Sequence, residues 1–299
     1  MDAPTSESTE LLPPSLLNKL ERLELVSRKI FRGQLKGERR SRRKGQSVEF
    51  MDYRNYVPGD DLRFLDWNLY ARLDRLFIKL FLEEEDLHFY ALIDSSASMR
   101  FGTPSKLRVA QQLAAALGFI GLCRADRVRL HTLTGPASEN PPILRGRSSV
   151  WRMIEYLTAI QPTGLTTLAD SVRRFCLRNT SKGIVVLLSD LLDKSGYQAA
   201  LRLLLAREFD IYVIHILSRE EMYPDLVGDL KLIDCEDRDV ADVTISQPLL
   251  NRYQKTLAQF IQDARQFCTR RGISYLLVDN SQSVEDIITK YLQERGLVR

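Results

Sequence analysis

Two near-continuous apolar runs, each followed by a carboxylate, constrain the fold of this chain more than any other feature of its sequence. The first run covers residues 87–93 and leads into Asp94, and the second covers residues 183–189 and leads into Asp190. Runs of this length, rich in branched and aromatic residues, are typical of buried strands. Ligands bind beyond the carboxyl ends of strands in open α/β sheets, so both carboxylates lie where a site is expected.

The rest of the chain alternates helix-like and strand-like periodicity. Helices are predicted over residues 15–31, 106–123, 148–160, 168–176, 197–207, 249–271 and 284–293. Strands are predicted over residues 77–82, 127–133, 211–217 and 274–278, with a hairpin across 230–245. We expect Ser15 to cap the first helix, the strand at 77–82 to pair with the strand at 87–93, and Trp151 to face inward. Alternation of this kind predicts an α/β fold: a doubly wound, mostly parallel, Rossmann-like sheet flanked by helices, with an N-terminal helical or irregular extension.

Hydroxyl groups accompany both carboxylates. Ser96 and Ser98 follow Asp94 closely, and Thr166 lies in a loop that leads into a helical pattern. Carboxylates and hydroxyls are hard oxygen donors, the kind that Mg²⁺ or Mn²⁺ prefers. Taken singly, each residue has a simpler explanation, since these residue types also cap helices and form turns. Together they predict one divalent-cation site, in which two carboxylates neutralise the ion and neutral hydroxyls leave it able to bind an outside carboxylate.

This arrangement, Asp94-x-Ser96-x-Ser98 followed by Thr166 and then Asp190, resembles the metal-ion-dependent adhesion site (MIDAS) of von Willebrand factor A domains. The resemblance implies a von Willebrand factor A-like domain whose loops after the strands form the recognition face. A partner protein would then offer an Asp or Glu side chain to the metal.

The upstream segment extends the resemblance to a particular family. It reads EFMDYRNYVPGDDLRFLDWN over residues 49–68 and FIKLFLEEE over residues 77–85. This resembles the signature of the bacterial DUF fifty-eight family, from about residue 37 to the C-terminus. The resemblance implies an adaptor that works with a MoxR-type AAA+ ATPase. We expect three regions: a disordered tail and N-terminal helix (1–36), the signature segment packed on the domain (37–86), and the von Willebrand factor A-like domain (87–299).

Two classes of function fit these patterns. The leading hypothesis is a non-enzymatic interaction module that docks a protein partner through the cation. The alternative is a metal-dependent, phosphatase-like hydrolase of the haloacid-dehalogenase type that uses Asp94 as its nucleophile. That chemistry usually needs a second Asp two residues on as general acid, and this chain has Ser96 there.

Composition and charge exclude several other classes. A formal charge of +4 does not by itself indicate a nucleic-acid or membrane partner. The basic run from Arg28 to Lys44 could bind nucleic acid or acidic lipid, but a solvated or acid-paired segment is the favoured interpretation, with residues 83–86 as a possible acidic partner. No apolar stretch reaches the length of a membrane span, and the N-terminus does not resemble a secretory signal, so a cytoplasmic protein is expected.

The remaining chemistry-bearing residues have structural interpretations. The four cysteines are widely spaced without a CxxC pair and mostly lie in apolar patterns, which predicts reduced, buried thiols. His88, His131 and His215 lie in separate strand patterns and are expected to be satisfied core residues. The dense charges over residues 52–72 are expected to form a buried salt-bridge lattice that ties this segment to the domain.

Overall fold

The computed structural model describes residues 11–27, 49–82, 87–134, 141–164, 167–226, 228–235 and 239–299. The basic run at 28–44, the acidic run at 83–86 and Thr166 lie outside these ranges. The chain forms two compact units, one made of Met1–Lys29 with Leu87–Arg299 and the other of Ile30–Asp86. We call them the large unit and the small unit.

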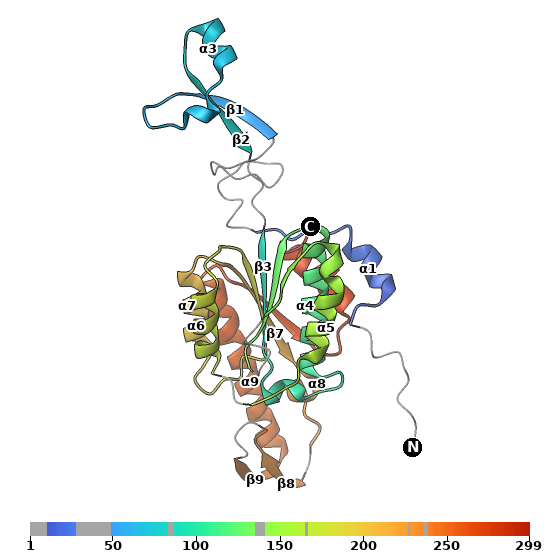
Figure 1. The fold of residues 1–299 in the computed structure, drawn as a ribbon. Helices are drawn as coiled ribbons and strands as arrows, with labels where there is room; N and C mark the ends of the chain where they lie inside the picture. Colours follow the sequence, from blue (N-terminus) through green and yellow to red (C-terminus); the bar gives the residue numbers. More distant parts are fainter. Residues whose placement is uncertain are drawn as a thin grey trace. The chain divides into compact units, whose positions relative to one another are not determined.

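A six-stranded sheet forms the centre of the large unit, in the order β10-β7-β6-β3-β4-β5 (Figure 1). The bounds are β3 His88–Ile93, β4 Arg127–Thr132, β5 Ile143–Arg145, β6 Ile184–Ser189, β7 Asp210–Leu217 and β10 Ser274–Asp279. The first five strands of this order run parallel, and β5 pairs antiparallel with β4 at the edge. The predicted α/β class with a mostly parallel sheet is confirmed, and β5 is an addition that the sequence did not predict.

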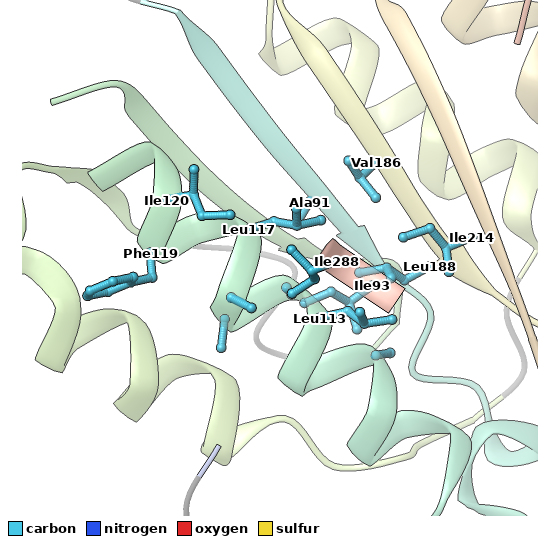
Figure 2. Packing of buried hydrophobic residues seen from close by; sticks show 14 of the residues in the cluster. Ala91, Ile93, Leu113, Leu117, Phe119, Ile120, Val186, Leu188, Ile214 and Ile288 are labelled. Atoms are coloured by element: carbon cyan, nitrogen blue, oxygen red, sulfur yellow. The ribbon is translucent and has the colours of Figure 1, made fainter. Parts of the chain in front are cut away.

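Helices cover both faces of this sheet because its strands are apolar on both sides. Successive side chains of β3 alternate between faces: Ala91 and Ile93 join one hydrophobic cluster, and Tyr90 and Leu92 join the other. The first cluster includes residues of α4 (Lys106–Cys123) and α5 (Val150–Ala159), and part of it is drawn in Figure 2. The second includes residues of α6 (Leu168–Arg178), α7 (Gln198–Ala206) and α9 (Gln247–Thr269).

Two expectations about these helices and the N-terminus are wrong. Trp151 is 76% exposed, and Met153 fills the inner face of α5 instead. Helix α1 spans only Pro14–Leu20 and is capped by Pro13 rather than by Ser15. The chain then leaves the helix, because Leu25 is fully buried in a short antiparallel bridge with Val298.

The C-terminal part of the large unit follows the predicted pattern. Strands β8 (Gly228–Ile233) and β9 (Val240–Ile245) form the expected antiparallel hairpin. A short helix, α8 (Arg219–Met222), follows β7, and α10 (Val284–Asp286) continues into the π-helical turn η6 (Ile287–Leu292). Among the described residues, no helix combines the length and the apolar character needed to cross a membrane.

The small unit is an antiparallel hairpin with two short helices. Strand β1 (Glu49–Asn55) pairs with β2 (Phe77–Leu82), and η2 (Leu62–Phe64) and α3 (Trp67–Leu73) lie between them in the sequence. The expected pairing of residues 77–82 with β3 is therefore wrong, since β3 pairs with β4 and β6.

Several charged residues in the described part of the small unit form local pairs. Arg54 binds both carboxylate oxygens of Asp60 at 2.8 Å, while the pair between Arg63 and Asp61 is exposed. The most enclosed of these carboxylates is Asp66, which accepts hydrogen bonds from the backbone of α3 and lies 3.1 Å from Lys79. These pairs stabilise the hairpin and its helix.

Candidate cation site

The two predicted carboxylates lie at the same end of the sheet, where the parallel strands β3 and β6 finish. Strands β3 and β6 are parallel neighbours, so their carboxyl ends coincide. The backbone N–H of Asp94 donates to the carbonyl of Leu188 at 2.9 Å, and the Ser189 hydroxyl donates to Asp94 Oδ2 at 2.6 Å. Asp190 directly follows Ser189. The pairing of the strands therefore brings Asp94 and Asp190 to one place.

Asp94 is a buried carboxylate with few donors. It is 6% exposed, and its Oδ1 accepts from the backbone N–H of Ser96 at 3.0 Å. Among the described residues no lysine, arginine or histidine forms an ion pair with it. Burial, and next the negative charge of Asp190, raise the pKa of Asp94 above its usual value, and the bonds from Ser189 and Ser96 offset only part of this. The anionic form of Asp94 therefore lacks a compensating positive charge.

The predicted serines line the same position. The hydroxyls of Ser96 and Ser98 lie 3.0 Å apart, in the turn that begins η3 (Ala97–Arg100). The Ser98 hydroxyl is also near enough to the Asp190 side chain to help lower the pKa of that carboxyl. Asp94, Ser96, Ser98 and Asp190 thus form one connected cluster of oxygen atoms.

Thr166 lies outside the described residues, but the loop that precedes it is bonded to the Asp94 turn. The backbone N–H of Thr163 donates to the Ser95 carbonyl at 2.8 Å, and the Ala97 N–H donates to the Gly164 carbonyl at 3.4 Å. The described part of the third predicted loop is therefore held against the first. Thr167 begins α6 as its N-cap residue without a side-chain capping bond.

Sequence reasoning missed two charged residues of the site, Lys106 and Glu221. Lys106 is fully buried at the first turn of α4, and its Nζ lies 2.8 Å from Asp190 Oδ2 and 2.5 Å from Glu221 Oε1. A lysine in the first turn opposes the helix dipole, and this unfavourable position was the one signal in the sequence. Glu221 lies three residues after Ser218 in a capping box that follows β7, which fixes its side chain.

The ammonium group of Lys106 makes the pKa of Asp190 shift in the opposite direction to that of Asp94. Burial acts to raise the pKa of Asp190, but the charge and hydrogen bond of Lys106 outweigh it and hold that pKa below its usual value. Asp190 is therefore a stable anion before any metal binds. The cluster contains three carboxylates (Asp94, Asp190 and Glu221) and one lysine, which pairs with Asp190 and Glu221. With all four groups ionised, the formal charge of the cluster is −2.

This donor set fits a small divalent cation. Carboxylate and hydroxyl oxygens are the ligands that Mg²⁺ and Mn²⁺ prefer, and a net charge of −2 matches one such ion. Asp94, Ser96, Ser98 and Asp190 are the described residues that could hold it, with Thr166 as the further predicted ligand. Asp94 provides the most direct reason to expect an ion, because it is a buried carboxylate with no positive partner in the described part of the chain.

The histidines do not join this cluster as ligands or as a catalytic set. His215 is fully buried and bonds through Nδ1 to the Tyr275 hydroxyl at 2.7 Å, and burial lowers its pKa to about 4. His131 packs against Phe175, and burial lowers its pKa to about 4 as well. Their Nε2 atoms have no hydrogen-bond partner, so the expectation of fully satisfied core histidines holds only in part. Among the described residues no disulfide joins the cysteines. Cys176 and Cys268 are buried as predicted, whereas Cys123 is half-buried and Cys235 is exposed, so the expected burial holds only in part.

Fold and site together define an α/β protein with an oxygen-donor cluster at the carboxyl edge of a mostly parallel sheet. A family model described as "Protein of unknown function DUF58" matches residues 52–262. The chain therefore belongs to this family, which confirms the resemblance read from the signature segment.

Two mycobacterial proteins match most of the chain. The proteins Mb1516 of Mycobacterium bovis and Rv1480 of Mycobacterium tuberculosis are each 29% identical over 254 residues, covering 82% of this chain and 78% of theirs. Among solved structures, BatB from Bacteroides thetaiotaomicron is 15% identical with a TM-score of 0.41, over 70% of this chain and 98% of that chain. The manganese-loaded TRAP protein of Plasmodium vivax is 21% identical with a TM-score of 0.31, over 44% and 57% of the two chains.

Proposed function

We propose that this protein is a non-enzymatic interaction module of the von Willebrand factor A type. Its MIDAS-like site holds Mg²⁺ or Mn²⁺ and, through that ion, a carboxylate of a partner protein. The observation that carries the proposal is the cluster of Asp94, Ser96, Ser98 and Asp190 at one sheet edge. Its buried Asp94 has no positive partner among the described residues.

The ligand chemistry supports binding rather than catalysis. Two carboxylates balance a divalent charge while the hydroxyls add none, so the bound ion keeps its attraction for an outside carboxylate. A phosphatase-like mechanism would need a general acid two residues after Asp94. Ser96 occupies that position and shares a hydrogen bond with Ser98, and a serine hydroxyl does not protonate a leaving group at neutral pH.

The proposed partner is a MoxR-type AAA+ ATPase in the cytoplasm, a partner that the resemblance described above implies. In this proposal the chain is the adaptor and the ATPase supplies the nucleotide hydrolysis.

The test is co-purification of the full chain with a co-expressed MoxR-type ATPase in Mg²⁺ or in chelator. We expect capture in Mg²⁺, with loss in chelator and in Ser96→Ala. The matched control is Glu208→Gln. It removes an exposed charge just before β7, at the amino ends of the strands and therefore away from the candidate site. Capture that survives both chelator and Ser96→Ala would contradict the proposal.

A further inference from the structure

We propose that the Lys106 ammonium group is a built-in competitor of the divalent cation, which sets how tightly the sheet-edge site binds the ion. This inference rests on the proposed function, because it concerns the same cation site. It assigns a role to a residue that is not itself a ligand.

The position of Lys106 indicates that its charge, rather than helix formation, is what the fold uses. It is the first residue of α4, behind the N-cap Ser105, where the helix dipole disfavours a cation. Its side chain is fully buried, which is costly for an ammonium group unless carboxylates pair with it. Asp190 and Glu221 are the two partners that offset this cost.

The contact with Asp190 is the basis of competition. Lys106 Nζ lies 2.8 Å from Asp190 Oδ2, while Oδ1 of the same carboxylate accepts from the backbone N–H of Leu192 at 3.1 Å. Part of the negative charge that would attract a metal ion at Asp190 is therefore already neutralised. A divalent ion bound at this cluster would also experience repulsion from the nearby ammonium group.

Glu221 works in the opposite direction to Lys106. Its Oε1 binds the ammonium group, and its Oε2 accepts from the backbone N–H of Ser218 at 2.8 Å. It thereby shares the lysine charge with Asp190 and keeps the cluster at a formal −2. Removing the Glu221 charge would leave −1, and removing the Lys106 charge would leave −3.

Opposite effects on cation affinity follow from these charges. Lys106→Met is expected to bind Mn²⁺ about tenfold more tightly than the unmodified protein, and Glu221→Gln about tenfold more weakly. Lys182→Met and Glu208→Gln are matched controls, because these residues form an exposed pair at the amino ends of β6 and β7. Both controls are expected to bind as the unmodified protein does.

The experiment is a titration of the full chain with Mn²⁺. Binding is measured by calorimetry and, independently, by the electron paramagnetic resonance signal of the Mn²⁺ that remains free. Circular dichroism of each variant verifies that it is folded. Should Lys106→Met fail to fold, Glu221→Gln decides alone, because glutamine keeps an acceptor for the capping bond to Ser218.

The outcomes separate this inference from the proposed function. If the unmodified protein binds Mn²⁺ but Lys106→Met binds equally or more weakly, or Glu221→Gln binds equally or more tightly, the competitor role is wrong and the cation site remains. If only Lys106→Met binds, the competitor role is supported and the cation-dependent function of the natural chain is overturned. If no protein binds Mn²⁺, both are overturned.

Discussion

Two enclosed aspartates, Asp66 in the small unit and Asp94 in the large unit, show opposite solutions to burying a carboxylate. Asp66 accepts from the backbone N–H groups of Asn68 and Leu69, from the Tyr53 hydroxyl and from Lys79. The bond from Leu69 is the main cause that lowers the pKa of Asp66 to about 2, with Lys79 and Tyr53 adding to it against burial. This carboxylate is complete as a structural anion.

Asp94 differs because, among the described residues, its charge is not balanced by a positive partner. It has one backbone donor and one hydroxyl, its pKa is raised by burial and by Asp190, and no described cation pairs with it. The difference indicates that Asp66 stabilises a helix start, whereas under the proposed function the charge of Asp94 would be balanced by a bound cation. Each prediction below changes one side of this comparison.

The largest expected effect on stability comes from replacing a lysine that pairs with an enclosed aspartate, and the two units should differ in its size. Lys106→Met leaves the buried carboxylate of Asp190 without its positive partner and is expected to lower the free energy of unfolding by about 3–5 kcal/mol without metal. Lys79→Met breaks a pair whose lysine is 36% exposed, so we expect about 1 kcal/mol or less. Chemical denaturation in chelator measures both, and equal losses would contradict the comparison.

The two units are also expected to differ in their response to acid. His131 and His215 have folded-state pKa values of about 4, below the ordinary 6.5, so the stability they contribute is present above pH 6.5 and is lost as the pH falls toward 4. Each shift corresponds to about 3 kcal/mol at most, and protonation of Asp94 offsets part of the loss.

The small unit contains no histidine, and Asp66 keeps its charge until the pH falls from 3.8 toward 2. Hydrogen exchange at pH 7, 5 and 4, corrected for intrinsic rates, is therefore expected to show loss of protection in the large-unit strands before β1 and β2. Simultaneous loss in both units would be inconsistent with the two sets of pKa values.

Asp66→Asn tests the structural side of the comparison. The substitution removes the ion pair with Lys79 and weakens the N-cap of α3, so protection of the Asn68 and Leu69 amides is expected to fall about fivefold. Asp61→Asn is the control, because Asp61 pairs with an exposed arginine. Unchanged protection in Asp66→Asn would mean that the cap is not what holds this turn.

The smallest expected change in stability is for Asp94→Asn. Burial already disfavours the anion, and an amide can keep the bonds to Ser96 and Ser189, so the free energy of unfolding in chelator should change by about 1 kcal/mol or less. The same variant should lose the stabilisation that Mg²⁺ gives the unmodified protein. A large loss in chelator would make Asp94 a structural residue like Asp66.

Most of the sheet could be predicted from the sequence because its strands are apolar on both faces and end in polar residues. The runs that became β3 and β6 are examples, and their parallel pairing places Asp94 beside Ser189. The small unit was harder, since β1 reads EFMDYRN, with three charged residues and no apolar run, and no strand was predicted there. With β1 missed, residues 77–82 were expected to pair with β3.

Of the candidate site, only the aspartates and serines proposed as ligands could be predicted from the sequence. Serine and aspartate after strands leave a visible motif, but the position of a lysine side chain depends on tertiary packing. Lys106 lies 84 residues from Asp190 and 115 from Glu221 in the sequence, so no local pattern joins them. The length of the N-terminal helix was predicted wrongly for a related reason. Leu25 forms a bridge with Val298, a residue far away in the sequence, and no local pattern indicates such a contact.

Mn²⁺ binding to the full chain, compared with Asp94→Ala and Ser96→Ala, tests the central claim most directly. The account predicts one ion per chain in the unmodified protein and at least tenfold weaker binding in either variant, while Glu208→Gln binds normally. Absence of binding to the unmodified protein, or equal binding by Asp94→Ala, would contradict it.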